Sequence, residues 1–145
     1  ACRSIREAAG KDIAVLVSKM VAGEREVMAG MFRAPNFGPA VLFGAGGIFA
    51  ESLADRTFRL APLSGAEAEA MLDDIRSAGL LKEQRGFPAA DRPALGGILQ
   101  ALGSIALLHP EIAEIDLNPI IISSGKPVVA DALVVLGGVK VENIF

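Results

Sequence analysis

The chain has 145 residues, enough for one domain with a hydrophobic core, and 52% of them are hydrophobic. The formal net charge is −3 and there is no basic run, so we expect no nucleic acid partner. The uncharged stretch Phe37–Ala50 is too short to span a bilayer, and we expect no membrane partner. A single cysteine, Cys2, excludes an internal disulfide. With no visible signal peptide, these features predict a cytoplasmic protein.

The N-terminal third of the chain alternates between apolar runs and turn residues. Residues 1–11 have the pattern of a helix that stops at Gly10. Asp12–Val21 is a nearly continuous apolar run, which predicts a strand buried on both faces. After a turn, a second strand is predicted over Arg25–Arg33, and it carries Glu26.

A glycine cluster, Gly44–Gly47, lies between a predicted short strand at Ala40–Phe43 and another at Ile48–Leu53. The cluster resembles a phosphate-binding loop only loosely, since it has neither the dinucleotide-binding nor the Walker A pattern. Glycines between strands also allow the backbone to bend or pack closely, and the pattern favours this structural interpretation. Asp55–Leu60 alternates in the manner of a half-exposed edge strand.

Two helices are predicted next. The first spans Ser64–Gly79, starts with a capping box formed by Ser64 and Glu67, and ends at a glycine. The second follows the cap residue Asp91, has Pro93 in its first turn, and ends before Pro110. Strands, then two helices, then further strands predict an α+β fold.

The stretch Glu111–Leu136 reads as two apolar strands joined by a tight turn with Gly125 in the loop. If Ser124 and Gly125 are the two loop residues, cross-strand partners have numbers that sum to 249, which places Asn118 opposite Asp131. Side chains alternate between faces along a strand, so Asp116 and Glu114 lie on the same face as Asn118.

Oxygen ligands on one face of such a hairpin could hold a hard cation. Directly opposed residues have Cβ atoms about 4.5–5.5 Å apart, close enough for an amide oxygen and a carboxylate to share one ion. Mg²⁺ prefers oxygen ligands and usually takes one or two carboxylates plus substrate phosphates. The alternative is a core hairpin with acids at its solvated edge, and geometry alone favours that alternative.

As an ordered set, the motifs resemble the C-terminal part of the ATP-grasp domain of NDP-forming acyl-CoA synthetases, the superfamily of ADP-forming acetate–CoA ligase and succinyl-CoA synthetase. The resemblance runs from about Ile13 to Leu136. The matching stretches are Phe37-Gly38-Pro39, Gly44-x-Gly46-Gly47-Ile48-Phe49-x-Glu51, Phe58-Arg59-Leu60-Ala61-Pro62-Leu63, Arg85-Gly86, Asp91, Glu114-Ile115-Asp116-Leu117-Asn118-Pro119 and Val129-Ala130-Asp131-Ala132.

The resemblance implies a mostly antiparallel sheet flanked by two main helices, closed by a β-hairpin that carries the metal ligands. Residues 1–145 would form a partial ATP-grasp domain that lacks the upstream lobe. The implied ligands of Mg²⁺ are Asn118 and Asp131, with Asp116 in a supporting catalytic role near the phosphates. The implied nucleotide contacts, for ATP or ADP, are the adenine-edge backbone of Lys19, Met20 and Val21, the ribose ligand Glu26, and Gly46 and Gly47 beside the cleft.

The reaction implied by the resemblance converts acyl-CoA, ADP and phosphate to acid, CoA and ATP through an acyl phosphate and a phosphohistidine. The partners implied are a nucleotide and a CoA-binding domain or subunit of the same enzyme, and we expect a homo-oligomer. The resemblance places the phosphate-binding lysine and the phosphohistidine in parts that this sequence does not contain, so we expect no turnover by this chain alone. The only histidine, His109, has the features of an ordinary helix-end residue. Arg59 and Arg85 could contact phosphate, or each could lie on the surface or anchor a loop.

Three functional classes stay open on the sequence. The first is a part of a working synthetase, which the presence of both Asn118 and Asp131 favours. The second is a non-catalytic regulatory module, like the synthetase-like regions of bacterial lysine acetyltransferases. The third is an α+β domain without activity of its own.

Overall fold

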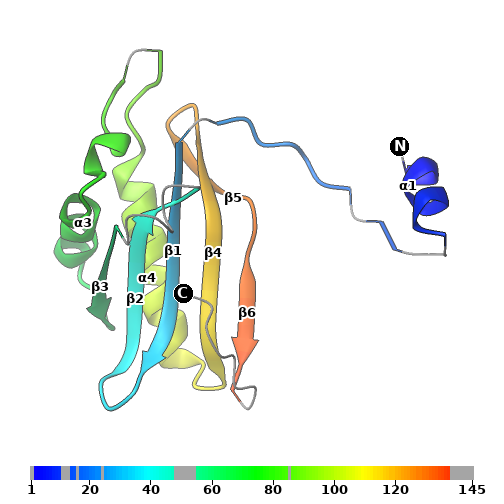
Figure 1. The fold of residues 1–145 in the computed structure, drawn as a ribbon. Coiled ribbons are helices and arrows are strands. Elements are labelled where there is room, and N and C mark those ends of the chain that lie inside the picture. The colour runs from blue at the N-terminus through cyan, green and yellow to red at the C-terminus, as the bar shows by residue number, and fades with distance from the viewer. Residues whose placement is uncertain are drawn as a thin grey trace.

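The computed structural model describes residues 2–10, 14–15, 17–23, 25–47, 55–84 and 86–137. In these ranges six antiparallel strands form one sheet in the order β3-β2-β1-β4-β5, and β6 pairs with the first part of β4 (Figure 1). The strands are β1 (Arg25–Ala34), β2 (Gly38–Ala45), β3 (Arg56–Leu60), β4 (Ile112–Ser123), β5 (Lys126–Val129) and β6 (Leu133–Leu136). The helical elements are α1 (Cys2–Ala9), α3 (Gly65–Asp74), the 3-10 helix η1 (Ala78–Leu81) and α4 (Arg92–Leu108). The predicted α+β class with a mostly antiparallel sheet is confirmed.

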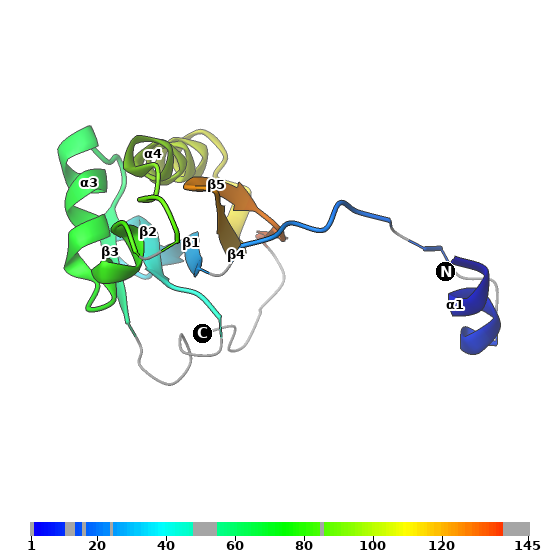
Figure 2. The same ribbon diagram turned by 90° about the horizontal axis from the view of Figure 1, so that it is seen from above.

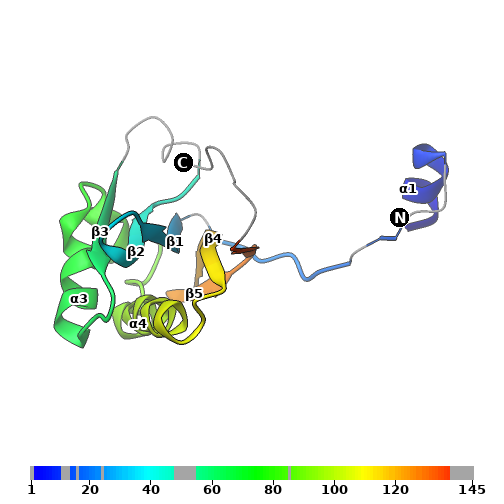
Figure 3. The same ribbon diagram turned by 90° about the horizontal axis from the view of Figure 1, so that it is seen from below.

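Helices α3 and α4 cover one face of the sheet (Figure 2). Between them and the strands lies the hydrophobic core, which includes Val27, Met31, Phe43, Leu72 and Leu99. The other side of the sheet, away from α3 and α4, is called the outer face below, and Figure 3 shows the same two layers from the opposite end. No helix in the described part of the chain is both long enough and apolar enough to cross a membrane.

The helix starts form as the local sequence predicts. At α3 the Ser64 hydroxyl accepts from the backbone N–H of Glu67, whose carboxylate accepts from the backbone N–H of Ser64. At α4 the Asp91 carboxylate accepts from the N–H of Ala94. The predicted end of α3 is wrong: the helix stops at Asp74 and the predicted stop residue lies inside η1.

The C-terminal end of α4 is tied to the start of β4. The Arg33 guanidinium donates to the carbonyl oxygens of Ala106 and His109 at 2.9 Å and of Ile112 at 2.8 Å. His109 caps α4 and its Nδ1 lies 3.0 Å from a carboxylate oxygen of Glu111. This contact fixes where β4, the strand with the predicted metal ligands, begins.

The N-terminal region differs from the sequence prediction. Residues 14–15 and 17–23 are not in a strand, and Val17 and Met20 are 76% and 90% exposed, so the predicted strand buried on both faces is wrong for these residues. They run as an extended arm from β1 to α1, which lies away from the sheet (Figure 1). The predicted helix stop at Gly10 is confirmed, with φ at +65°. The predicted strand over Ile48–Leu53 lies outside the described residues.

Candidate functional site

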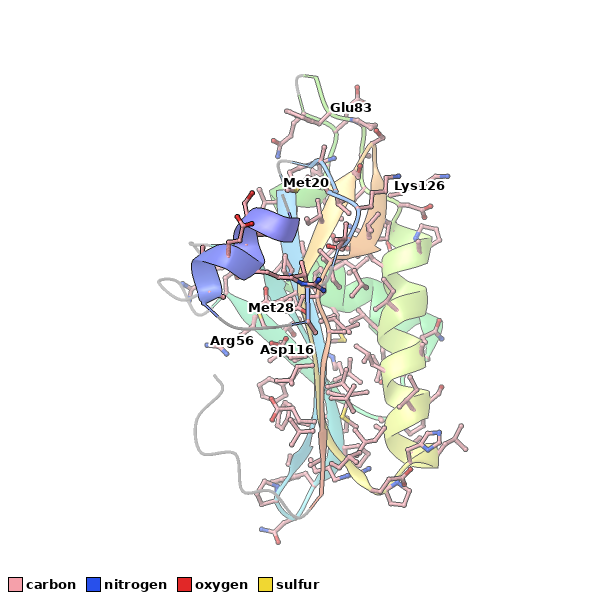
Figure 4. All side chains as sticks on the ribbon, turned by 90° about the vertical axis from the view of Figure 1, so that its right-hand side faces the viewer. Met20, Met28, Arg56, Glu83, Asp116 and Lys126 are labelled. Atoms are coloured by element: carbon pink, nitrogen blue, oxygen red, sulfur yellow. The ribbon has the colours of Figure 1, made fainter. Side chains whose placement is uncertain are left out.

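The outer face is built from two rows of side chains that cross the sheet. Cross-strand partners point to the same face, so the register defines each row. One row consists of Phe58, Leu42, Gly30, Asp116 and Leu133. The next consists of Leu60, Ala40, Phe32, Glu114 and Val135. Each row therefore sets one carboxyl group among apolar neighbours, and Figure 4 shows Asp116 on the side of the sheet away from α4.

Each of these two carboxyl groups has one oxygen that is shielded from water and receives no hydrogen bond. Glu114 Oε1 and Asp116 Oδ1 are buried atoms with no hydrogen-bond partner. Burial raises the pKa of Glu114, and the charge of Asp116 raises it further. Burial likewise raises the pKa of Asp116, to which the charge of Asp131 adds. Unpaired buried carboxylate oxygens are costly, so this arrangement favours a cation or a donor at the outer face.

The predicted hairpin register is confirmed on both sides of the candidate ligands. Ile120 pairs with Val129 and Asp116 pairs with Leu133, and both pairs sum to 249. Ser124 and Gly125 have the positive φ values, 49° and 83°, of the predicted turn.

Between those two pairs the ladder is interrupted. β5 ends at Val129 and β6 begins at Leu133, so Asp131 lies in the break between the two strands. The register on either side of the break predicts that Asn118 faces Asp131 there. β4 also has one extra residue relative to β1 here. Both side chains are exposed, and Asp131 Oδ1 accepts from the N–H of Ala132 at 2.9 Å. The interruption leaves both side chains accessible to a ligand.

The residues present fit a hard divalent cation. Asn118, Asp131 and Asp116 would each ligate a cation through a side-chain oxygen, and one oxygen of Asp116 has no hydrogen-bond partner. The described residues contain no group of three or more histidine, cysteine, aspartate or glutamate side chains arranged to hold a metal. A site with few protein ligands suits Mg²⁺, which keeps several waters and commonly completes its shell with phosphate oxygens.

Three of the predicted nucleotide contacts come together at the end of β2. The N–H of Gly46 donates to the carbonyl oxygen of Glu26 at 2.9 Å. A Cβ added at Gly47, whose φ is +73°, would lie 3.0 Å from Glu26 Oε2. The glycine turn is thus packed on Glu26, and the structural interpretation of the glycines holds: a side chain at Gly46 would collide with the β1 backbone.

A pocket of about 480 Å³ opens beside this glycine turn. Its lining residues come from the end of β2 and from the segment around η1: Ala45, Gly46, Arg76, Ser77, Gly79, Leu80 and Gln84. The wall is fixed by a buried carboxylate, Asp55, which accepts from the N–H groups of Arg76 and Ser77 at 2.7 and 2.8 Å. Although burial alone would raise the pKa of Asp55, these hydrogen bonds and that of the Ser77 hydroxyl hold it below its usual value.

The remaining predicted residues are placed differently. Lys19, Met20 and Val21 lie in the extended arm; Lys19 and Met20 are exposed and Val21 is half-buried. Arg59 does not face the outer surface, because it pairs with Asp74 of α3, which supports its anchoring role. Arg85 lies outside the described residues.

Sequence reasoning missed the role of Arg25. This guanidinium is 5% exposed and donates to the carbonyl oxygens of Leu80 (3.0 Å), Lys82 (3.1 Å) and Pro88 (2.6 Å). It also stacks over the Phe87 ring at 5.9 Å. Its acceptors are backbone groups 55 to 63 residues later, so the sequence carried no signal for them.

Comparison with known proteins identifies the family. The ATP-grasp domain family matches residues 3–136, and the chain therefore belongs to it. Within that family it is similar to ADP-forming acid–CoA ligases. It is 41% identical over 123 residues to acetate–CoA ligase [ADP-forming] I of Archaeoglobus fulgidus, a match that covers 85% of this chain and 18% of that protein. It is 42% identical over 122 residues to subunit beta of acetate–CoA ligase [ADP-forming] I of Pyrococcus furiosus. That match covers 84% of this chain and 53% of the subunit.

Solved structures agree with this placement. The acetyl-coenzyme A synthetase 1 of Ca. Korarchaeum cryptofilum, in complex with coenzyme A and Mg-AMPPCP, matches with TM-score 0.74 and 41% identity over 79% of this chain and 54% of that chain. The structure of ACD1 of the same organism in complex with coenzyme A matches with TM-score 0.84 and 38% identity. That match covers 93% of this chain and 61% of that chain. The chain thus spans only about half of the Pyrococcus furiosus subunit and less than a fifth of the Archaeoglobus fulgidus protein.

Proposed function

We propose that this chain is the nucleotide- and Mg²⁺-binding part of an ADP-forming acid–CoA ligase, which converts acyl-CoA, ADP and phosphate to acid, CoA and ATP. The observation that carries the proposal is the set of oxygen ligands around Asp116 on the outer face, where a buried carboxylate oxygen has no partner. The relatives named above are ligases, and they lend no support to the alternative of a regulatory module in a lysine acetyltransferase.

In this proposal Asn118 and Asp131 ligate Mg²⁺ and Asp116 holds its charge close to the ion. When bound there, the metal would supply positive charge that offsets the negative charge developing during phosphoryl transfer. The chain's own side chains act by position: Asp116 is held on a paired strand, while the interrupted ladder leaves Asn118 and Asp131 accessible.

The nucleotide would extend from this site toward the glycine turn. Glu26 would accept from the ribose hydroxyls, with Gly46 and Gly47 beside the cleft, and the backbone of Lys19, Met20 and Val21 would meet the adenine edge. Because the relatives are longer and solved relatives are complexes with coenzyme A, we further propose a CoA-binding domain or subunit as partner. We also propose assembly into a homo-oligomer and a cytoplasmic location.

Calorimetric titration of ADP with and without Mg²⁺ tests the proposal. We expect binding that requires Mg²⁺ and that weakens by more than about tenfold in both Asp131→Asn and Asn118→Ala, since loss of even an outer-shell partner costs ~10–100-fold. Glu83→Gln, at an exposed acid in the loop before α4, is the matched control and should bind as the parent does. Metal-independent binding, or equal affinity in all four proteins, would contradict the proposal.

A further inference from the structure

An apolar patch lies on the outer face at the end of the sheet farthest from the glycine turn. It surrounds a pocket of about 330 Å³ lined only by apolar residues: Phe32, Ala34, Phe37, Ala40, Phe58 and Leu60. Three of these side chains are conspicuously solvent-accessible, Phe37 at 72%, Phe58 at 61% and Leu60 at 48%. Clustered exposed apolar side chains of this kind mark interaction sites more often than single exposed residues do.

The acid Glu114 borders the patch. Glu114 is the direct cross-strand partner of Phe32, which lines the pocket, and Phe32 is followed in the same row by Ala40 and Leu60. On its other side Glu114 pairs with Val135. Its buried Oε1 atom has no hydrogen-bond partner. The patch therefore combines an apolar pocket with one unsatisfied acceptor at its rim.

We propose that this patch is a docking surface for a polypeptide segment in which a lysine or arginine is flanked by large apolar side chains. An apolar side chain would fill the pocket, whose volume is at the small end of ligand pockets and suits one such group. The basic side chain would pair with the Glu114 carboxylate, which has a buried oxygen without a donor. The six residues that line the pocket offer a nucleotide no polar side chain, and the proposal does not rest on the proposed function.

A second copy of this chain fits the patch less well. Two-fold pairing places the same surface on both copies, which would bring Glu114 of each toward an apolar surface that already carries the same charge. Like charges in apolar surroundings repel, so the charge of the surface favours a basic partner.

Capped tripeptides provide the test, with amide NMR shifts of the ¹⁵N-labelled chain in metal-free buffer as the readout. The probes are acetyl-Leu-Lys-Leu-amide, acetyl-Leu-Gln-Leu-amide and acetyl-Leu-Glu-Leu-amide. We expect the lysine probe to bind about tenfold more tightly than the glutamate probe, as one charge-assisted hydrogen bond implies, with shifts centred on Phe32, Phe58 and Glu114. Glu114→Gln should abolish that preference, and Glu83→Gln should retain it.

Phe58→Ser tests the apolar half of the surface. Phe58 is largely exposed, so its replacement should leave the fold intact while weakening all three probes about equally; Leu60→Ser serves if that variant does not fold. Binding indifferent to probe charge, shifts centred elsewhere, or no binding would overturn the proposal. Concentration-dependent dimerisation that Phe58→Ser abolishes and the lysine probe does not inhibit would assign the patch to a second copy and would also overturn it.

Discussion

The two carboxyl groups of the outer face set the pH response of the isolated chain. Burial raises the pKa of both Glu114 and Asp116. The folded chain therefore favours the protonated, neutral form of each carboxyl group more strongly than the unfolded chain does. Their contribution to stability is therefore fully present below the ordinary carboxyl pKa and is lost as pH rises through the raised pKa values. A bound cation would offset this loss.

From this we predict that Glu114→Gln stabilises the metal-free chain at pH 7 by on the order of 1 kcal/mol, because it removes a dehydrated charge. The gain should disappear near pH 3, where the glutamate is already protonated. Denaturant titrations at the two pH values measure it, with Glu83→Gln as the control. If Glu114→Gln were instead less stable than the parent at pH 7, Glu114 would not be an unpaired, dehydrated charge in the folded chain.

The pKa of Asp55 is shifted in the opposite direction, so its effect on stability has the opposite pH dependence. Its pKa is held below the usual value by its hydrogen bonds, so its stabilisation exists above the ordinary carboxyl pKa and is lost as pH falls through the lowered value. We predict that Asp55→Asn destabilises the chain at pH 7 by about 1–3 kcal/mol, because an amide cannot accept from both N–H groups. The free energy of unfolding, measured from pH 7 down to pH 3, should converge for the two proteins. A constant difference would count against a role for the charge.

Arg25 links two elements of the fold, because it joins β1 to the segment that lines the pocket beside the glycine turn. We predict that Arg25→Ala costs about 2–4 kcal/mol in unfolding free energy, because three carbonyl groups lose a charged donor. Arg25→Lys should be intermediate, since an ammonium cannot reproduce the planar fork. Urea denaturation measures both, and a lysine variant as stable as the parent would show that the fork geometry is unimportant.

Some elements could be predicted because their signals are local. The capping residues Ser64 and Asp91 act within one turn, and Ser124 with Gly125 fixes the hairpin register from within the loop. The end of α3 could not be predicted, because Asp55 takes the N–H groups of Arg76 and Ser77 from outside the helix. The apolar arm before β1 was misjudged because an apolar run has no periodicity that distinguishes a paired strand from an unpaired segment.

The candidate site was predictable to a similar extent. Alternation along β4 correctly predicted Asp116 and Glu114 on one face, and the turn correctly predicted the register on both sides of Asn118. That Asn118 faces Asp131 stays a prediction. The sequence could not show that Gly30 and Phe32 of β1 lie beside these acids, because the paired residues are more than 80 positions apart in the chain. It also could not show the interruption between β5 and β6 beside Asn118, or the extra residue that β4 has relative to β1 at the same place.

At the scale of the whole molecule, the arm and α1 are separate from the sheet and its core. We predict that deletion of residues 1–22 changes the unfolding free energy by less than about 0.5 kcal/mol, since the described residues of the arm are mostly exposed. The deletion should weaken ADP binding because it removes Lys19, Met20 and Val21, while Mn²⁺ alone binds as before. Calorimetry measures both, and unchanged ADP affinity would place the adenine edge elsewhere.

The most direct test of the central claim is paramagnetic broadening of amide resonances by Mn²⁺ in the presence of ADP. The claim is that the outer face of the sheet holds the metal between Asn118 and Asp131. We predict that Asp116, Asn118 and Asp131 broaden first and that Asp131→Asn abolishes the effect there. Broadening centred on other acids, such as Glu83 or Asp73, or its persistence in Asp131→Asn, would contradict the claim.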